Sequence, residues 1–471
     1  MRPRLAWVDA AALVVPALVF VPLSLVRFVD GDEGVYAYAS RLALHGNLPY
    51  RDFFFEQTPL LPYVYGAWIG VAGESWYALR LLSALFACAV GTLVYVHAAR
   101  RFGRRAALLG LLLYVSSALV FGFFVVVKTF ALATLLLLAA FLLVDGRAQS
   151  TRAVFAAGAL TALAVDVRLI FLAAVPALVV ATRERIAPFA GGFLAGLVPS
   201  IVLFALAPRQ FVFDNLGYHL AKDSGGLGHE LAQKARTIEN LVGLGKADHL
   251  AGLQVALLLV AAVAAAVLLR RLPLALWIAL LLALGCLAPS PTYAQYFSVV
   301  VPFAVLGVLE AWPGRIPLVL GAAVAAYALA GALDVGRQRA GDPVQKPSIA
   351  SVQAVAREVQ RLSRSNERVL SSWPGYLFGT HARAEPDYTN HFAPAAASKL
   401  SPAEARRDLV ASEQELEARI RTRRPRIVVY RNWLTVDPFA RWDEALRAGG
   451  YRRVATVESA GIYLAAGHAR G

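Results

Sequence analysis

Long apolar runs separated by short basic segments fill the chain as far as Leu333, and charged residues become dense only after it. A helix needs about 20 predominantly apolar residues to cross a bilayer. The pattern therefore predicts a polytopic α-helical membrane protein with about eleven transmembrane helices. The predicted spans are 10–29, 79–99, 106–125, 129–144, 153–167, 168–182, 186–207, 249–269, 273–289, 294–311 and 315–333.

The first span could be mistaken for a cleaved signal peptide, because Arg2 and Arg4 precede it. The residues that follow it, Arg27 to Asp32, contain no small-x-small cleavage site. We therefore expect a retained membrane anchor.

Basic residues orient the predicted spans, because cytoplasmic loops of membrane proteins are enriched in Lys and Arg. If the spans alternate in direction, the basic residues at the N-terminus and in the short loops fall on one side, which we interpret as the cytoplasm. They are Arg2, Arg4, Arg100–Arg105, Arg147, Arg152, Arg183, Arg185, Arg270, Arg271 and Arg315. The loops 30–78 and 208–248 and the tail from Asp334 are then extracytoplasmic.

The polar tail is predicted to form a small α/β domain, because helical and β-rich segments alternate along it. The segments are 348–363 and 439–448 for helices, and 368–371, 427–430, 453–457 and 461–465 for strands. We therefore expect a transmembrane domain at 1–334, with interfacial helices in the loop 30–78, and an extracytoplasmic α/β domain at 335–471.

Composition agrees with a membrane protein: 58% of residues are hydrophobic and 16% are charged, against about a quarter charged in soluble domains. The formal net charge is +15. The cations sit beside apolar runs, which favours contact with anionic lipid or phosphate groups and argues against a nucleic-acid partner. Cys88 and Cys286 lie inside apolar runs, so the cysteines indicate neither a disulfide framework nor a metal site.

The loop 30–78 contains the densest chemical signal in the chain. It opens with Asp32 and Glu33, and residues such as Tyr36 and Leu44 could line one face of a helix at the membrane interface. A carboxylate at the mouth of a span can act as a base on a hydroxyl group. The alternative is that these acidic residues simply end a transmembrane helix in water.

Several short motifs follow one another in a fixed order along this loop and beyond. They are Asp32-Glu33, Tyr36–Ala39, Gly46–Tyr50, Glu56–Leu60 and Tyr293–Phe297, the last followed by Pro302. This ordered set resembles the GT-C superfamily of glycosyltransferases, which use polyprenyl-phosphate sugars. It is most similar to the branch of protein O-mannosyltransferases and aminoarabinose transferases (ArnT-like).

The resemblance implies an inverting hexosyl- or pentosyltransferase of the cytoplasmic membrane, acting at its outer face on the cell envelope. Its donor is a polyprenyl-phosphate sugar, and its acceptor is a hydroxyl of a glycan, lipid or protein. Asp32 corresponds to the catalytic base, and we expect Glu33, the other carboxylate of the catalytic pair, to support it. Glu56 corresponds to a loop glutamate that serves an acceptor or metal site in some members, although Gln57-Thr58 replaces the usual Lys-Pro after it.

The departing phosphate of such a donor needs cations. We expect these among Lys128, Arg168, Arg51, Arg80 and Arg27. Lys128 and Arg168 are the most informative, because each interrupts an apolar stretch where a charge is costly. Alternatively, Lys128 is a loop lysine that extends to the interface, and Arg168 pairs with Asp166.

The loop 208–248 contains His219, Lys222, Asp223, His229 and Glu230, with a flexible point at Gly225-Gly226. It could shape the acceptor site. A divalent metal ion, bound by Glu56 and His219 or His229, is the one cofactor we consider, against the simpler interpretation of plain polar loop residues.

A multi-spanning transporter or lipid flippase is the competing functional class, because it would share the spans and the intramembrane cations. Transporters often contain inverted repeats. No internal repeat is visible in this sequence, and the asymmetric first loop favours the enzyme.

Overall fold

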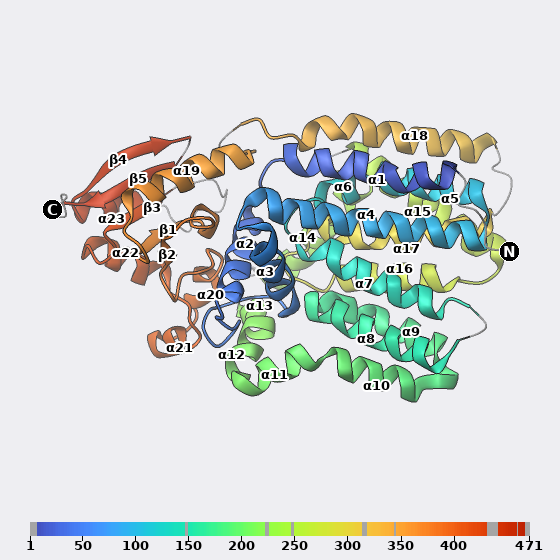
Figure 1. Cartoon of the computed structure of the whole chain (residues 1–471), viewed down its shortest axis with the longest axis horizontal. Helices are drawn as coiled ribbons and strands as arrows, with labels where there is room; N and C mark the ends of the chain where they lie inside the picture. Colours follow the sequence, from blue (N-terminus) through green and yellow to red (C-terminus); the bar gives the residue numbers. More distant parts are fainter. Residues whose placement is uncertain are drawn as a thin grey trace. The chain divides into compact units, whose positions relative to one another are not determined.

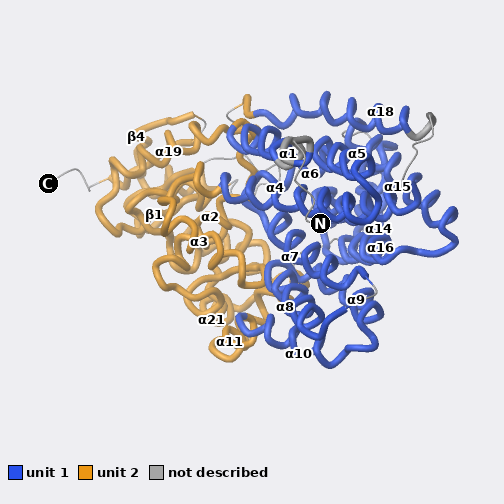
Figure 2. Tube along the Cα trace, turned by 45° about the vertical axis from the view of Figure 1, so that its right-hand side comes forward, with its two compact units in different colours: residues 1–25, 80–199, 224–339 blue, residues 26–79, 200–223, 340–471 orange. Residues whose placement is uncertain are grey.

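The computed structural model describes residues 7–146, 149–221, 226–245, 249–312, 318–342, 345–430, 441–458 and 460–466. The chain divides into two compact units, coloured separately in Figure 2. Unit 1 contains residues 1–25, 80–199 and 224–339, and unit 2 contains residues 26–79, 200–223 and 340–471. Each unit therefore combines three separate stretches of the chain.

Unit 1 is built from helices that run roughly along one another in Figure 1. Their sequences are dominated by Leu, Ala and Val, which favours helices that are apolar on all sides. They are α1 (Trp7–Val26), α4 (Trp76–Arg101), α5 (Arg104–Val115), α6 (Ala118–Phe123), α7 (Thr129–Val144), α8 (Thr151–Val167), η1 (Leu169–Ala174), α9 (Val175–Ala181), η2 (Arg183–Arg185), α10 (Ile186–Gly196), α11 (Val198–Leu206), α14 (Leu227–Leu241), α15 (His249–Leu269), α16 (Leu274–Cys286), η4 (Ala294–Val300), α17 (Val301–Ala311) and α18 (Leu318–Asp334). Three of these helices, α1, α4 and α11, have one end in unit 2.

Helices α8 and α10 approach closely because glycines face each other across their contact. A Cβ atom on Gly158 would lie 2.1 Å from the carbonyl oxygen of Phe189, and one on Gly192 would lie 1.9 Å from that of Phe155. Neither position can accept a larger residue without separating the helices. Small residues at such contacts are the usual means by which membrane helices pack.

Three described helices are long and apolar enough to cross a membrane: α4, α15 and the continuous helix Ala294–Ala311. A fourth results if the bent pair Arg183–Gly196 and Val198–Leu206 counts as one span. Helices or runs of helices occupy the positions of the predicted spans. The membrane part of the fold prediction is therefore confirmed, whereas the count of eleven spans is not, because most runs are shorter or are interrupted, as at Ser116 and Ser117. Arg2, Arg4, Arg147 and Arg315, used for the predicted orientation, lie outside the described residues.

In unit 2, the loop 30–78 contains two helices, α2 (Gly31–Leu44) and α3 (Leu60–Ala72). The first was expected from its amphipathic pattern, and the second was not predicted. They pack together at Gly66, where a Cβ atom would lie 2.8 Å from the carbonyl oxygen of Ser40.

The stretch predicted as the loop 208–248 is largely helical in its described part. Unit 2 contains α12 (Pro208–Val212), η3 (Phe213–Gly217) and α13 (Tyr218–Ala221) from this stretch, and unit 1 contains α14. Lys222, Asp223 and Gly225 lie outside the described residues.

The C-terminal part of unit 2 is an α/β domain with a five-stranded sheet in the order β2-β1-β3-β5-β4. Strands β2, β1 and β3 are parallel, whereas β5 is antiparallel to both β3 and β4. The strands are β1 (Arg368–Ser371), β2 (Arg383–Ala384), β3 (Ile427–Tyr430), β4 (Tyr451–Val457) and β5 (Ala460–Ala465). The small sheet predicted for the tail is therefore present.

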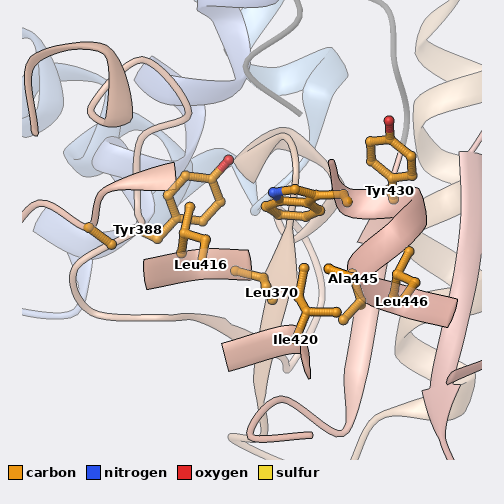
Figure 3. Close-up of a cluster of buried hydrophobic side chains, with 10 residues drawn as sticks. Leu370, Tyr388, Leu416, Ile420, Tyr430, Ala445 and Leu446 are labelled. Carbon is orange, nitrogen blue, oxygen red and sulfur yellow. The ribbon is translucent and has the colours of Figure 1, made fainter. Parts of the chain in front are cut away.

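The helices of this domain are α19 (Ile349–Leu362), α20 (Pro394–Ala397), α21 (Pro402–Arg407), α22 (Glu413–Arg421) and α23 (Trp442–Ala448), with short turns η5 (Val335–Gln338) and η6 (Pro374–Tyr376) before and within it. One hydrophobic core lies between the sheet and α22 and α23. Figure 3 shows side chains of β1, β3 and these helices, such as Leu370, Ile420 and Leu446, directed toward one another.

Candidate active site

Asp32 lies in the first turn of α2, which begins with a capping box. The N–H of Asp32 donates to Oδ1 of Asp30 at 3.1 Å, and the N–H of Asp30 donates to Oε1 of Glu33 at 2.8 Å. These two bonds satisfy backbone donors that a helix start leaves open. Glu33 is fully buried in this arrangement, whereas Asp32 is only partly buried. The two carboxylates that were predicted as catalytic therefore differ in their surroundings.

The turn after α2 contains Arg51, which was predicted to bind phosphate. Its guanidinium group is exposed and pairs with Asp52, with Nη2 lying 2.8 Å from Oδ2. The hydrogen bond from Arg51 lowers the pKa of the Asp52 carboxyl, although partial burial works in the opposite direction. Tyr50 adopts a positive φ of 69° in the same turn, and its hydroxyl donates to the carbonyl of Gln57 at 2.7 Å. Arg51 thus belongs to a local turn structure.

Glu56 and His219, predicted as acceptor or metal residues, lie together in unit 2. Nε2 of His219 is 3.1 Å from the carbonyl oxygen of Glu56, and the buried Glu56 carboxylate accepts a hydrogen bond from the side chain of Asn390. Asp214 joins them, since its Oδ2 accepts the N–H of Phe55 at 2.9 Å. Burial raises the pKa of Asp214 well above its ordinary value, which favours the protonated form.

Within the described ranges, these side chains do not form a group of three metal ligands. The Glu56 carboxylate already accepts from Asn390, and His219 faces the backbone oxygen of Glu56. His229 is exposed on α14 of unit 1. Across the described ranges, there is no group of three or more His, Cys, Asp or Glu side chains that could hold a metal ion. A bound metal needs several such ligands in one place.

Unit 1 contains a buried cationic cluster around the start of α7, formed by Lys128 and Arg168. Nζ of Lys128 donates to Oε1 of Gln295 at 2.5 Å, and Gln295 belongs to the motif Tyr293–Phe297. Nη1 of Arg168 donates to the hydroxyl of Thr129 at 3.0 Å, next to Lys128 in the chain. The sequence placed these residues apart, and the fold brings them to one end of α7.

Aromatic rings frame this cationic cluster. The guanidinium carbon of Arg168 lies 4.8 Å from the ring centroid of Phe130 and 4.7 Å from that of Tyr296. Both cations are nearly inaccessible to solvent, with 2% of Lys128 and 6% of Arg168 exposed. Nε of Arg168 has no hydrogen-bond partner within the described part of the chain. Buried cations of this kind usually have a functional partner.

The remaining two predicted cations have structural contacts. Arg80 is fully buried in α4 and donates to the carbonyl oxygen of Ser24 at 2.9 Å, which satisfies an open acceptor near the end of α1. Arg27 lies in unit 2, where its guanidinium group covers the ring of Phe28 and donates to that residue's carbonyl oxygen at 2.8 Å. The first contact joins two helices, and the second is local.

Sequence reasoning missed three residues of these clusters: Asp214, Asn390 and Gln295. Gln295 could have been found, because it lies inside a motif that was already identified. Asn390 follows no motif in the tail, and Asp214 lies in a stretch that was interpreted as a loop. Their roles depend on contacts between distant parts of the chain.

No protein-family model matches the chain, and no curated protein matches it. Several solved structures, in contrast, are similar to it over most of its length. The chain is similar to ArnT from Cupriavidus metallidurans bound to undecaprenyl phosphate, with 16% identity, a TM-score of 0.69, and coverage of 98% of this chain and 99% of that one. The apo form of the same protein gives a TM-score of 0.67 at 16% identity, covering 96% and 97% of the two chains.

A more distant similarity is to the apo oligosaccharyltransferase of Archaeoglobus fulgidus, with 14% identity, a TM-score of 0.51, and coverage of 90% of this chain and 69% of that one. All three are GT-C glycosyltransferase structures. The chain therefore shares the fold of these structures, which agrees with the resemblance drawn from the motifs at the level of the fold.

Proposed function

We propose that this protein is an inverting glycosyltransferase that moves a sugar from a polyprenyl-phosphate donor to an acceptor hydroxyl at the outer face of the cytoplasmic membrane. The observation that carries the proposal is the contrast at the start of α2. Glu33 is fully buried and is engaged as a helix cap, whereas Asp32 is only partly buried. Asp32 is thus the carboxylate of this pair that is placed to accept a proton from a substrate.

The fold supports the donor class. One of the similar structures, ArnT, was solved with undecaprenyl phosphate bound. Apolar helices such as α4 and α15 suit a donor whose lipid lies in the bilayer. We assign the donor phosphate to Lys128 and Arg168, because a buried ammonium and guanidinium group stabilise phosphate oxygens through charge-assisted hydrogen bonds.

In the proposed reaction, Asp32 removes the proton of the acceptor hydroxyl as its oxygen attacks the anomeric carbon. The bond between that carbon and the phosphate oxygen breaks, and polyprenyl phosphate leaves with the electron pair. Attack from the side opposite the leaving group inverts the anomeric configuration. One base suffices, because the departing phosphate is stable as an anion and needs only cations to stabilise its charge.

We assign Glu56, Asn390 and His219 to the acceptor side. A buried carboxylate and amide can orient a hydroxyl group through paired hydrogen bonds. The predicted orientation, with a cytoplasmic N-terminus and an extracytoplasmic domain at 335–471, belongs to the same proposal, since the reaction needs these groups at the outer face. The proposal also assigns Arg51 and Arg80 to phosphate binding, in addition to their contacts with Asp52 and Ser24.

The proposal is tested in a strain from which the gene has been deleted. Mass spectrometry of lipid extracts and envelope glycans is expected to detect accumulation of one polyprenyl-phosphate sugar and loss of that sugar from an envelope component. Wild-type protein should reverse both changes, and Asp32→Asn should reverse neither. Full complementation by Asp32→Asn would contradict the assignment of Asp32 as the base. Movement of lipid or solute by the intact protein with no sugar transfer would contradict the enzyme and favour a transporter or flippase.

A further inference from the structure

One face of α2 is formed by Gly31, Gly34, Tyr38 and Arg41. Their spacings of three, four and three residues place them in one stripe, because each residue advances about 100° around an α-helix. Asp32 and Glu33 lie about 120° or more from the middle of this stripe by the same count. A contact along the stripe therefore leaves the two carboxylates on other sides of the helix.

All four stripe residues contact one segment of the C-terminal domain, Trp373–Ala384, which we call the docking segment. The indole Nε1 of Trp373 donates to the carbonyl oxygen of Gly31 at 2.7 Å. A Cβ atom on Gly34 would lie 2.3 to 2.6 Å from atoms of the Trp373 indole, so that ring rests directly on the backbone of α2.

The other end of the stripe is held by polar bonds. The N–H of Ala384 donates to the hydroxyl oxygen of Tyr38 at 2.7 Å. The guanidinium group of Arg41 donates to three backbone carbonyl oxygens, those of Leu377 at 2.7 Å, Thr380 at 2.5 Å and Ala382 at 3.2 Å. Such directed bonds fix both the rotation of α2 about its axis and its position along the axis.

The docking segment is itself rigidly supported, because it connects two neighbouring strands. It begins after β1 and ends in β2, which pair in parallel. The Trp373 ring is fully buried, stacks on Trp76 with centroids 5.8 Å apart, and meets the edge of Tyr376 at 5.0 Å. Glu74 ties the network together, since it pairs with Arg41 at 3.2 Å and accepts the N–H of Gly379 at 2.9 Å.

We propose that the docking segment of the C-terminal domain sets the position of Asp32, with Trp373 and Arg41 acting as positioning residues. The domain then serves catalysis through α2 without supplying a reacting group. This proposal rests on the proposed function in one respect, the role of Asp32 as base. Misplacing a catalytic group by about 1 Å can cost about 100-fold in rate, so the effect is measurable.

The central test is Trp373→Phe, which removes the bond to Gly31 and retains an aromatic ring. Two quantities are measured on the purified full-length protein: the hydrogen exchange of the amides at the start of α2, and kcat and KM for transfer from an extracted lipid-linked sugar. We expect faster exchange at residues 33–37 and a kcat about 10- to 100-fold lower, with KM for the donor within about two-fold.

Trp442→Phe is the matched control, because Trp442 is a fully buried tryptophan in the hydrophobic core of the same domain. It is expected to lower the melting temperature and to leave kcat and α2 exchange unchanged. Tyr38→Phe, which removes only the acceptor for Ala384, gives a milder variant should Trp373→Phe fail to fold, and is expected to change kcat in the same direction.

Unchanged exchange in Trp373→Phe, or faster exchange with a kcat equal to that of wild type, would overturn the positioning role. Equal losses of kcat in Trp373→Phe and Trp442→Phe would also overturn it, because they would indicate a general effect of domain stability. Absence of transfer in the wild-type protein would instead count against the proposed function, and the exchange measurement would still decide whether the segment holds α2.

Discussion

The indole nitrogen of Trp373 lies 2.7 Å from the carbonyl oxygen of Gly31, one residue before Asp32 in the chain. The two residues are separated by 342 positions, so the fold joins the C-terminal domain to the first loop directly beside Asp32. The sequence predicted the tail at 335–471 as a separate domain, because charged residues become dense there. In the structure, residues 340–471 of that tail, the loop 30–78 and part of the stretch 208–248 belong to the same compact unit.

Glu33 is predicted to support α2 through its capping bond. Glu33→Gln keeps an oxygen acceptor for the N–H of Asp30, whereas Glu33→Ala removes it. We expect Glu33→Ala to lose about 1 kcal/mol of stability, with a moderate fall in kcat that Glu33→Gln largely restores. Thermal unfolding and steady-state transfer measure both effects. If Glu33→Gln abolishes transfer as completely as Asp32→Asn, Glu33 takes part in proton transfer.

Lys128 is predicted to bind the donor phosphate. Lys128→Met keeps most of the apolar stem and removes the ammonium group, so affinity for undecaprenyl phosphate should fall about 10- to 100-fold, the value of a charge-assisted hydrogen bond. Arg168→Met should behave in the same way. Titration of purified protein with undecaprenyl phosphate, followed by native mass spectrometry, measures the affinity.

Arg271→Gln provides the control for these two variants. Arg271 is an exposed cation of unit 1 that pairs with Glu310, and its loss removes the same charge from the protein. Its affinity for undecaprenyl phosphate should match that of wild type. An equal loss in all three variants would indicate a general effect of net charge and would remove the specific role of Lys128.

His391 is predicted to make stability depend on pH. It is buried, neither ring nitrogen has a hydrogen-bond partner among the residues that the structure describes, and burial lowers its pKa from 6.5 to about 3. Below pH 6.5 the unfolded chain binds a proton that the folded protein excludes. The stability contributed by neutral His391 is therefore complete above pH 6.5 and is lost as the pH falls toward 3.

His391→Leu should remove this dependence, which amounts to about 2 kcal/mol at pH 5 relative to neutral pH. Melting temperatures of wild type, His391→Leu and the surface control His45→Leu, measured from pH 5 to pH 8, test this. His391→Leu should lose less stability on acidification than wild type and His45→Leu. Parallel curves for all three would show that His391 is not the responsible group.

Much of the fold could be predicted from the sequence, because apolar runs report helices directly. The positions of the spans, the amphipathic helix in the loop 30–78 and the strands at 368–371 and 427–430 agree with the structure. Helix α3 could not be separated from its aromatic-rich surroundings. Helix α14 is amphipathic, so its periodicity could have revealed it, but the stretch 208–248 was interpreted as a loop.

The site could be predicted only in part. Asp32, Glu33 and Glu56 are candidates because they belong to ordered motifs, and Lys128 is a candidate because a charge interrupts an apolar stretch. Contacts such as Lys128 with Gln295, or Glu56 with Asn390, join residues 167 and 334 positions apart. Periodicity and local motifs contain no information on such distant pairs. The sequence therefore could not distinguish an exposed cation such as Arg51 from a buried cation such as Lys128.

The most direct test of the account is the transfer activity of Asp32→Asn. Purified wild-type and variant protein are incubated with a polyprenyl-phosphate sugar fraction extracted from the deletion strain, together with its envelope acceptor fraction, and the release of polyprenyl phosphate is followed by mass spectrometry. Removing a general base should lower the rate by about 10²- to 10⁴-fold, with donor binding and melting temperature unchanged. A variant that releases polyprenyl phosphate at the wild-type rate would contradict the assignment of Asp32 as the base.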